Sequence, residues 1–163
     1  MPDAINKFVE NRNIAQVRDI QRDIHALYRI DASQYDEEKK LVIRKVYDLI
    51  PSNMENKKKR IVVKKKIEGK AGHKQFSDYA DEFEFLTNSG VALAVRAISN
   101  PKFPLIESES KNLLKLYLSD VGLLTNLLYS TNVNAVLRDV CSVNLGSVYE
   151  SMVAQELHAH GFA

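Results

Sequence analysis

Apolar residues recur every three or four positions in the first third of the chain, a spacing that predicts two amphipathic helices. Asn13 can act as the N-cap of the first helix. The buried stripe of this helix is predicted to be Ile14, Val17, Ile20, Ile24, Leu27 and Tyr28. Asp36 can cap the second helix, which is expected to end before Pro51 because proline disfavours a helical residue ahead of it. Its inward residues are predicted to be Leu41, Val42, Val46, Leu49 and Ile50.

The middle of the chain changes from helical to extended patterning. A third helix is predicted over about 73–88, ended by Gly90 as a left-handed terminator. Its apolar face comprises Phe76, Tyr79, Ala80, Phe83 and Leu86. Two strands are predicted at 91–98 and 113–118, and they can pair antiparallel across the proline-containing loop between them. Further helices are expected at 120–129, 132–140 and 146–160, the last with Val148, Met152, Val153 and Leu157 on one face.

This order of elements predicts a mainly α (α+β) fold. Helices followed by a two-stranded hairpin are the layout of a winged helix-turn-helix core, here with more helices after the hairpin. The helix before the hairpin, about 73–88, occupies the place of a recognition helix. The predicted organisation is a helical, winged-helix-like region at 1–118, followed by the start of a second helical region at 119–163.

The composition is that of an ordinary folded protein, with 163 residues, 45% of them hydrophobic and 27% charged. No apolar run approaches the roughly 20 residues of a membrane span, and the first ten residues lack the pattern of a secretory signal. Cys141 is the single cysteine, so it cannot form an internal disulfide, which favours a reducing compartment. We therefore expect a cytoplasmic protein that does not associate with membranes.

The net charge of +2 hides a strong asymmetry. Residues 57–74 hold nine basic residues and one acid, a charge of +8, so the rest of the chain carries −6. Such a stretch can contact phosphates without reading sequence. The candidate nucleic-acid-binding residues are Lys57, Lys58, Lys59, Arg60, Lys64, Lys65, Lys66, Lys70 and Lys74, with Gln75 and Ser77 at the start of the third helix. Residues 61–63 within this stretch could form a short helix or an edge strand.

The motifs of several enzyme classes are missing from the sequence. The six glycines are scattered, so no phosphate-binding loop can be assembled. One cysteine and four histidines give no zinc pattern, and His158 and His160 would point in different directions on a helix. Glu-x-Lys pairs begin at Glu55, Glu68 and Glu109, among other places, and a motif that recurs in so charged a chain is better explained by chance. We expect no catalytic residue, metal or cofactor.

Residues 115–124, Lys-Leu-Tyr-Leu-Ser-Asp-Val-Gly-Leu-Leu, are the most informative segment. They are predicted to form a strand that stops at an acid, breaks at glycine and continues as a helix. This segment resembles the strand-to-helix passage of prokaryotic AAA-family ATPases that carry an uncharacterised C-terminal domain. Other segments resemble that family in the same order: Met1–Ala4, Asp19–Ile24, Ile50–Ser52, Ala80–Gly90, Ser99–Pro101, Pro104–Leu105, Gly146–Glu150 and Val153–Gly161.

The resemblance implies that the chain is the middle and later part of a longer protein, with the ATPase domain before Met1. It also implies that Gly146 begins the acidic helix of a nuclease-like C-terminal domain, with Glu150 at the acidic position and the other metal-binding positions beyond Ala163. A single glutamate cannot hold a catalytic divalent ion, so the chain itself is expected to be inert.

Two functions from different classes remain open at this point. The chain could be a winged-helix module that binds DNA or another polyanion through residues 57–74, or a regulatory module. Alternatively, it could be a structural domain that binds a protein partner or self-associates through apolar surfaces. Acidic residues of the third helix, namely Asp78, Asp81, Glu82 and Glu84, oppose its insertion near phosphates. An enzyme in its own right has the least support.

Overall fold

The computed structural model describes residues 2–35, 39–55, 79–130, 133–134, 138 and 145–162. The helices and strands, in chain order, are α1 (Pro2–Asn11), α2 (Ile14–Tyr35), α3 (Lys40–Glu55), α5 (Ala80–Asn88), β1 (Ala92–Ile98), the 3-10 turn η3 (Leu105–Ser108), β2 (Glu109–Leu118), α6 (Val121–Leu128) and α8 (Gly146–Ala159). The protein is therefore mainly helical with a two-stranded antiparallel hairpin, which confirms the predicted fold class.

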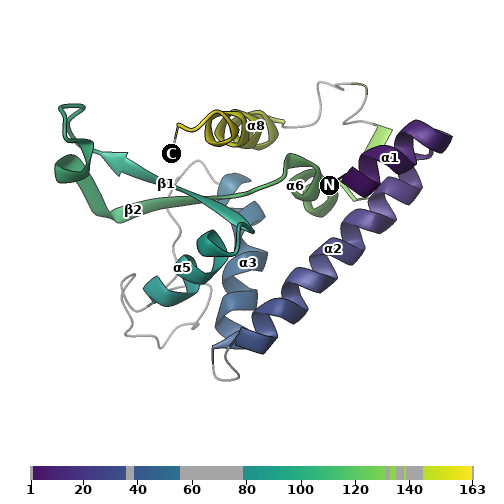
Figure 1. Cartoon of the computed structure of the whole chain (residues 1–163), viewed down its shortest axis with the longest axis horizontal. Coiled ribbons are helices and arrows are strands. Elements are labelled where there is room, and N and C mark those ends of the chain that lie inside the picture. Colours follow the sequence, from purple (N-terminus) through teal and green to yellow (C-terminus); the bar gives the residue numbers. More distant parts are fainter. Residues whose placement is uncertain are drawn as a thin grey trace.

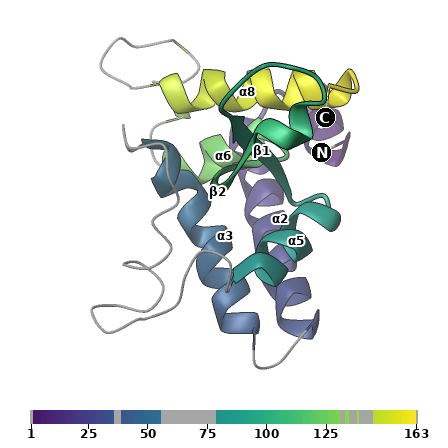
Figure 2. The ribbon, with the colours of Figure 1, turned by 90° about the vertical axis from the view of Figure 1, so that its left-hand side faces the viewer.

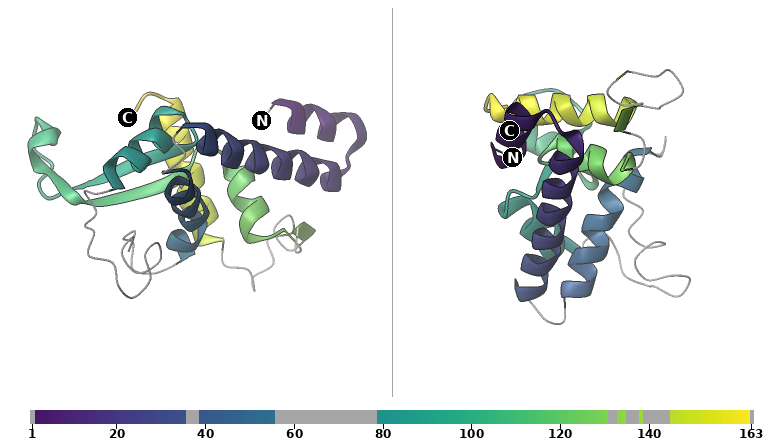
Figure 3. Two further views of the ribbon diagram at one scale, coloured as in Figure 1. Left: turned by 90° about the horizontal axis from the view of Figure 1, so that it is seen from below. Right: turned by 90° about the vertical axis from the view of Figure 1, so that its right-hand side faces the viewer.

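The hairpin lies between two groups of helices. In Figure 1, α2 and α3 form a helical pair below it, and α8 runs above it. Figure 2 shows α8 lying over α6 and the hairpin, and these elements are in contact. The view from below in Figure 3 shows the far end of the hairpin projecting away from the helices.

An apolar core forms where α3, α5, α6 and the near end of the hairpin meet. Ile43, Val46 and Ile50 of α3 are each at most 2% exposed, which follows from their spacing on one helical face. The other members of this core are Tyr47, Tyr79, Phe83, Leu86, Val91, Ala92, Leu116, Tyr117, Leu118, Leu123 and Leu124. Leu123 and Leu124 lie after residue 118, so one core spans both predicted regions, whose boundary stays a prediction.

The first helices differ from the sequence prediction in three respects, and the first of these is α1 itself, which was not predicted. Helix α3 continues through Pro51 to Glu55 instead of ending before the proline. Proline removes one helical hydrogen bond, but Pro51 is buried at the end of the apolar face of α3, and this packing offsets the loss. Leu27 and Leu41, both predicted to face inward, are 56% and 59% exposed. The proposed cap Asp36 lies outside the described residues.

Helix α5 ends as the sequence predicts. Gly90 has a φ of 71°, the left-handed conformation that glycine adopts without strain. The Gly90 amide donates to the Thr87 carbonyl (3.0 Å) and the Val91 amide donates to the Leu86 carbonyl (3.1 Å), the two bonds of a Schellman motif. Tyr79, Phe83 and Leu86 are buried as predicted, whereas Ala80 is exposed. Phe76 lies outside the described residues.

The hairpin is confirmed, with a longer second strand than predicted. Pairing runs from Ala92 opposite Leu118 to Ile98 opposite Glu109, with an irregularity between Arg96 and Ile98. Leu116, Tyr117 and Leu118 are all buried, although alternate residues of a strand point to opposite faces. This end of β2 is covered on both faces: all three residues belong to the apolar core, and the Tyr117 hydroxyl also bonds Glu150 of α8.

The two later helices fall close to the predicted ranges. Asp120 is the N-cap of α6, and its carboxylate accepts from the Gly122 and Leu123 amides at 2.7 and 3.2 Å. Gly122 lies in the first turn of α6, within the helix predicted at 120–129, and the strand ends before it, at Leu118. Of the helix expected at 132–140, the structure describes residues 133, 134 and 138 alone. No helix among the described residues is long and apolar enough to cross a membrane.

Candidate functional site

The predicted nucleic-acid-binding residues lie in a part of the chain that the structure leaves undescribed. Residues 56–78 contain the whole set, namely Lys57, Lys58, Lys59, Arg60, Lys64, Lys65, Lys66, Lys70, Lys74, Gln75 and Ser77. The short apolar stretch at 61–63 also falls there, and Cys141 lies in another undescribed segment. Phosphate contact by these residues therefore stays a prediction.

The helix in the recognition-helix position, α5, carries carboxylates on its exposed side. Asp81 and Glu84 are exposed and line a hollow of about 430 Å³ with Phe85, Asn88 and Ser89. Lys39 pairs with Asp81 at 2.5 Å and so links the start of α3 to α5. Negative charge on this face repels a phosphate backbone, so the described part of α5 is poorly suited to enter a DNA groove.

Glu150, the acid singled out by the family resemblance, is engaged with the hairpin. Its Oε1 pairs with Lys115 Nζ at 2.5 Å and accepts a hydrogen bond from the Tyr117 hydroxyl at 2.9 Å. Burial, followed by this bond to Glu150, raises the pKa of Tyr117. The cluster ties α8 to β2. Among the described residues, no three His, Cys, Asp or Glu side chains come together to hold a metal ion.

The two histidines near the C-terminus, His158 and His160, belong to no cluster of potential metal ligands among the described residues. His160 Nδ1 donates to the Glu156 carbonyl at 2.8 Å, as a residue at the end of a helix commonly does. His158 is exposed in the last turn of α8. Glu109, the first residue of one Glu-x-Lys pair, forms an ion pair with Arg96 at 3.1 Å across the hairpin. The His160 bond stabilises the end of α8, and the Arg96–Glu109 pair stabilises the hairpin.

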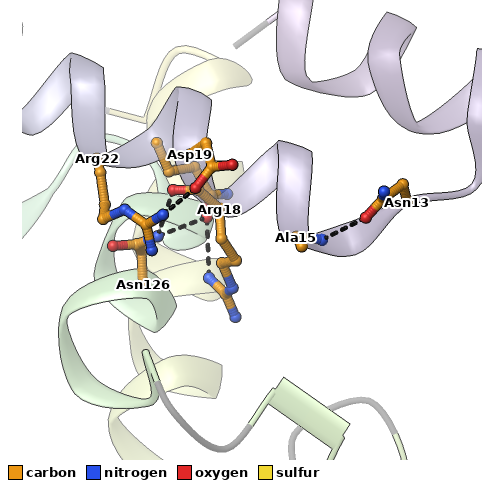
Figure 4. Close-up of polar contacts among 7 residues, drawn as sticks. Asn13, Ala15, Arg18, Asp19, Arg22 and Asn126 are labelled. Atoms are coloured by element: carbon orange, nitrogen blue, oxygen red, sulfur yellow. Dashed lines mark hydrogen bonds and ion pairs between the residues drawn. The ribbon is translucent and has the colours of Figure 1, made fainter.

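A group of buried polar side chains joins α2 to α6, and we call it the α2–α6 polar seam: Arg18, Gln21, His25, Thr125 and Asn126. Arg18, Gln21, His25 and Asn126 are each at most 7% exposed. Asn126 Nδ2 donates to the Arg18 carbonyl (3.1 Å) and to Gln21 Oε1 (3.3 Å). Figure 4 shows Asn126 reaching up from α6 to the underside of α2. Arg18 Nη1 donates to Gln21 Oε1 (2.9 Å) and Thr125 Oγ1 (3.0 Å).

His25 closes the seam at the point where α2, α3 and α6 meet. Its Nε2 lies 3.1 Å from the Leu123 carbonyl, which can only accept, so Nε2 carries the hydrogen. Nδ1 of this neutral tautomer accepts from the Tyr47 hydroxyl of α3. Burial is the largest influence on His25 and lowers its pKa. Both ring nitrogens are therefore satisfied in the uncharged form.

Sequence reasoning missed this seam because it followed apolar residues alone. The signal was nevertheless present: Arg18, Gln21 and His25 are three and four residues apart, which places them on one face of a helix. Of the predicted apolar stripe, Val17 is buried while Ile14, Ile20, Ile24 and Tyr28 are half-buried. The most buried face of α2 is thus mainly polar.

Helix α8 buries small polar residues and exposes large apolar ones. Ser147 and Ser151, at 6% and 0% exposed, face the rest of the protein. The exposed apolar residues of α8 are Tyr149, Met152, Val153 and Leu157, at 56%, 52%, 58% and 48%. We call these four side chains the α8 apolar face. Of the four residues predicted to share a face, Met152, Val153 and Leu157 are exposed together, whereas Val148 is half-buried.

A comparison with known protein families identifies the greater part of the chain. The model of a domain of unknown function, DUF8612, matches residues 1–134. The chain belongs to this family. The match covers α1 to α6, and hence the whole α2–α6 polar seam, whereas α8 lies beyond it. No curated protein and no solved structure matches the chain.

Proposed function

We propose that this chain is a non-catalytic interaction module that binds another protein through the α8 apolar face. One observation carries the proposal: α8 turns Ser147 and Ser151 inward and leaves four large apolar side chains in contact with water. Exposed apolar side chains gathered on one surface are typical of protein-binding sites. The resemblance to AAA-family ATPases fits this role, since a module of such a protein packs against its neighbouring domains.

The chemistry of α8 favours a protein over a polyanion or an anionic membrane. The helix contains two glutamates, Glu150 and Glu156, and no lysine or arginine. Phosphate-rich partners are bound through basic side chains, which α8 lacks. Its apolar residues are also spaced at three and four positions, so they form one continuous strip that another helix or a sheet can cover.

The proposal is tested by measuring the mass of the chain in solution. The α8 apolar face should pair with itself when no partner is present, so the wild-type chain should self-associate as concentration rises. The double variant Val153→Asp, Leu157→Asp should remain monomeric in sedimentation velocity, because two charges replace the centre of the strip. His158→Asp is the control, since it adds a charge to an exposed position on the same helix. A wild-type chain that stays monomeric and binds no apolar dye would contradict the proposal.

A second candidate is binding of DNA or another polyanion by the basic stretch 57–74, in the manner of a winged helix. Its charge of +8 and its place directly before α5 and the hairpin favour it. A fluorescent duplex should then bind at low salt and dissociate at moderate salt, because phosphate contacts release counterions. Replacing Lys64, Lys65 and Lys66 by glutamine should weaken that binding, whereas Lys102→Gln in the hairpin loop should change it less. No binding at low salt would remove this candidate.

A further inference from the structure

Two arginines one helical turn apart on α2 have opposite environments. Arg22 is exposed and forms an ion pair with Asp19 on the same helix. Arg18 is only 7% exposed, and among the described residues no ion pair includes it. Figure 4 shows the Arg18 guanidinium pointing away from the Asp19–Arg22 pair. The buried arginine is thus the one without a carboxylate.

The contacts of Arg18 hold its guanidinium in one orientation. Nη1 donates to Gln21 Oε1 at 2.9 Å, to Thr125 Oγ1 at 3.0 Å and, more weakly, to the Gly122 carbonyl at 3.4 Å. All three acceptors are uncharged. They come from α2 and α6, so the seam that joins these helices also positions the arginine.

The opposite edge of the same guanidinium is unused within the described part of the chain. Nε is buried and has no hydrogen-bond partner there, and each hydrogen bond recorded for the Arg18 side chain uses Nη1. Nη2 lies along the same edge of the planar guanidinium group as the Nε hydrogen. Nε and Nη2 together form the fork with which arginine binds the two oxygens of a carboxylate or a phosphate.

Such an arrangement is costly without an anion. Arginine remains protonated in proteins, and removing an unpaired charge from water costs free energy. Burial lowers the pKa of Arg18, and no acid in the described part of the chain counteracts this effect. A bound anion would offset this cost. Neutral acceptors would still orient the guanidinium when the anion is absent.

We propose that Arg18 anchors a binding site for a single oxyanion, a carboxylate or a phosphate group, at the junction of α2 and α6. The Nε and Nη2 hydrogens donate to two oxygens of the ligand, while Gln21 and Thr125 keep the fork in place from behind. The site lies within residues 1–134, the part that the DUF8612 model matches. The site does not involve α8, so a negative result for anion binding would leave the proposed function untouched, and the reverse also holds.

Thermal unfolding of the full chain tests the site at constant pH and ionic strength. Potassium phosphate or potassium acetate replaces potassium chloride, so that stabilisation by a bound anion is distinguished from the general screening of charges by salt. The melting temperature should rise and saturate with at least one of the two anions. Saturation with phosphate alone identifies a phosphate ligand, and saturation with acetate alone identifies a carboxylate ligand. A rise that does not saturate with either anion overturns the proposal.

Matched arginine variants locate the effect. Arg18→Lys keeps the charge and removes the fork, so it should bind the anion about tenfold more weakly or worse. Arg22→Lys is the control one turn away and should bind like the wild type. Equal binding by wild type and Arg18→Lys would refute the site. If Arg18→Lys does not fold, the anion is instead titrated into the wild-type protein while the arginine Nε–H nuclear magnetic resonance signals are followed. The Arg18 signal must shift. If the signals of other arginines shift and that of Arg18 does not, the proposed site is refuted.

Discussion

Helices α2 and α3 lie side by side, but they are held in place by different interactions (Figure 1). Helix α3 buries Ile43, Val46 and Ile50 against α5, α6 and the hairpin. Helix α2 buries Arg18, Gln21 and His25 against α6. Apolar contacts are non-directional and tolerate small shifts, whereas each buried polar group needs a partner at a defined distance and angle. The α2–α6 polar seam therefore determines position more strictly than the apolar core does.

The largest expected effect comes from the apolar side of this comparison. Ile50→Ala should lower the free energy of unfolding by about 3 kcal/mol, because it removes a fully buried side chain and leaves a cavity. Urea denaturation measures the change. Leu41→Ala on the same helix is the matched control and should change stability by less than about 0.5 kcal/mol, since Leu41 is 59% exposed. Equal effects of the two variants would mean that α3 does not pack as described.

The polar seam should respond to the loss of a single amide. Asn126→Ala removes the donor to the Arg18 carbonyl and Gln21 Oε1, and leaves these buried acceptors without it. We expect a loss of about 2 kcal/mol in urea denaturation. Combining it with Gln21→Ala in a double-mutant cycle should give a coupling of about 1 kcal/mol, because the two side chains share a bond. Strict additivity would indicate that the seam does not act as one unit.

His25 makes the seam sensitive to pH. Its lowered pKa means that, below the ordinary value of about 6.5, the unfolded chain binds a proton more readily than the folded protein does. Stability is therefore retained above about pH 6.5 and falls as the pH drops, by at most about 1.4 kcal/mol per pH unit from this group.

Urea denaturation from pH 7.5 to 5.5 measures the free energy of unfolding of the wild type and of His25→Gln, and the two values are compared at each pH. Charged neighbours contribute as well: Arg29 lowers the pKa of His25 while Asp48 and Asp120 raise it, so the same series at higher salt shows how much they matter. The difference between the two proteins should shrink toward low pH. The control for the loss of a histidine is His158→Gln, which should change the free energy of unfolding by less than about 0.5 kcal/mol at pH 7.5, because His158 is exposed.

The smallest effect is expected from an ion pair at the surface between α2 and α3. Arg29 donates to Asp48 Oδ1 from Nε at 3.1 Å and from Nη2 at 2.7 Å. Both side chains are about a third or more exposed, so water and salt screen the attraction. Arg29→Gln should cost about 0.5 kcal/mol in low salt and less in high salt. A loss comparable to that of Asn126→Ala would remove the distinction between buried and exposed polar contacts.

Local signals predicted most of the secondary structure. Asn13 caps α2, Gly90 ends α5, and Asp120 caps α6, because each of these residues satisfies backbone groups within a few positions of itself. Pro51 is the instructive failure. Its local preference would end α3, but the helix continues through it to Glu55, and Pro51 is buried next to the core residue Ile50.

The candidate sites were less predictable than the helices and strands. The charge of the basic residues at 57–74 indicates a polyanion-binding segment, yet these residues lie outside the described part of the chain. Arg18 is an unremarked arginine in a polar helix until α6, more than a hundred residues later, supplies Gly122 and Thr125 beside it. Likewise, the apolar spacing of α8 identifies a face without saying whether that face is covered.

The sequence by itself determined where most helices and both strands form, since these depend on neighbouring residues, their spacing and their caps. Only the tertiary structure decided that α2 turns polar residues inward, that Glu150 pairs with the hairpin, and that α8 exposes its larger apolar side chains. These outcomes depend on which distant surfaces meet. A repeating pattern specifies the faces of a helix, but the partner that covers a face is chosen by the packing of the whole chain.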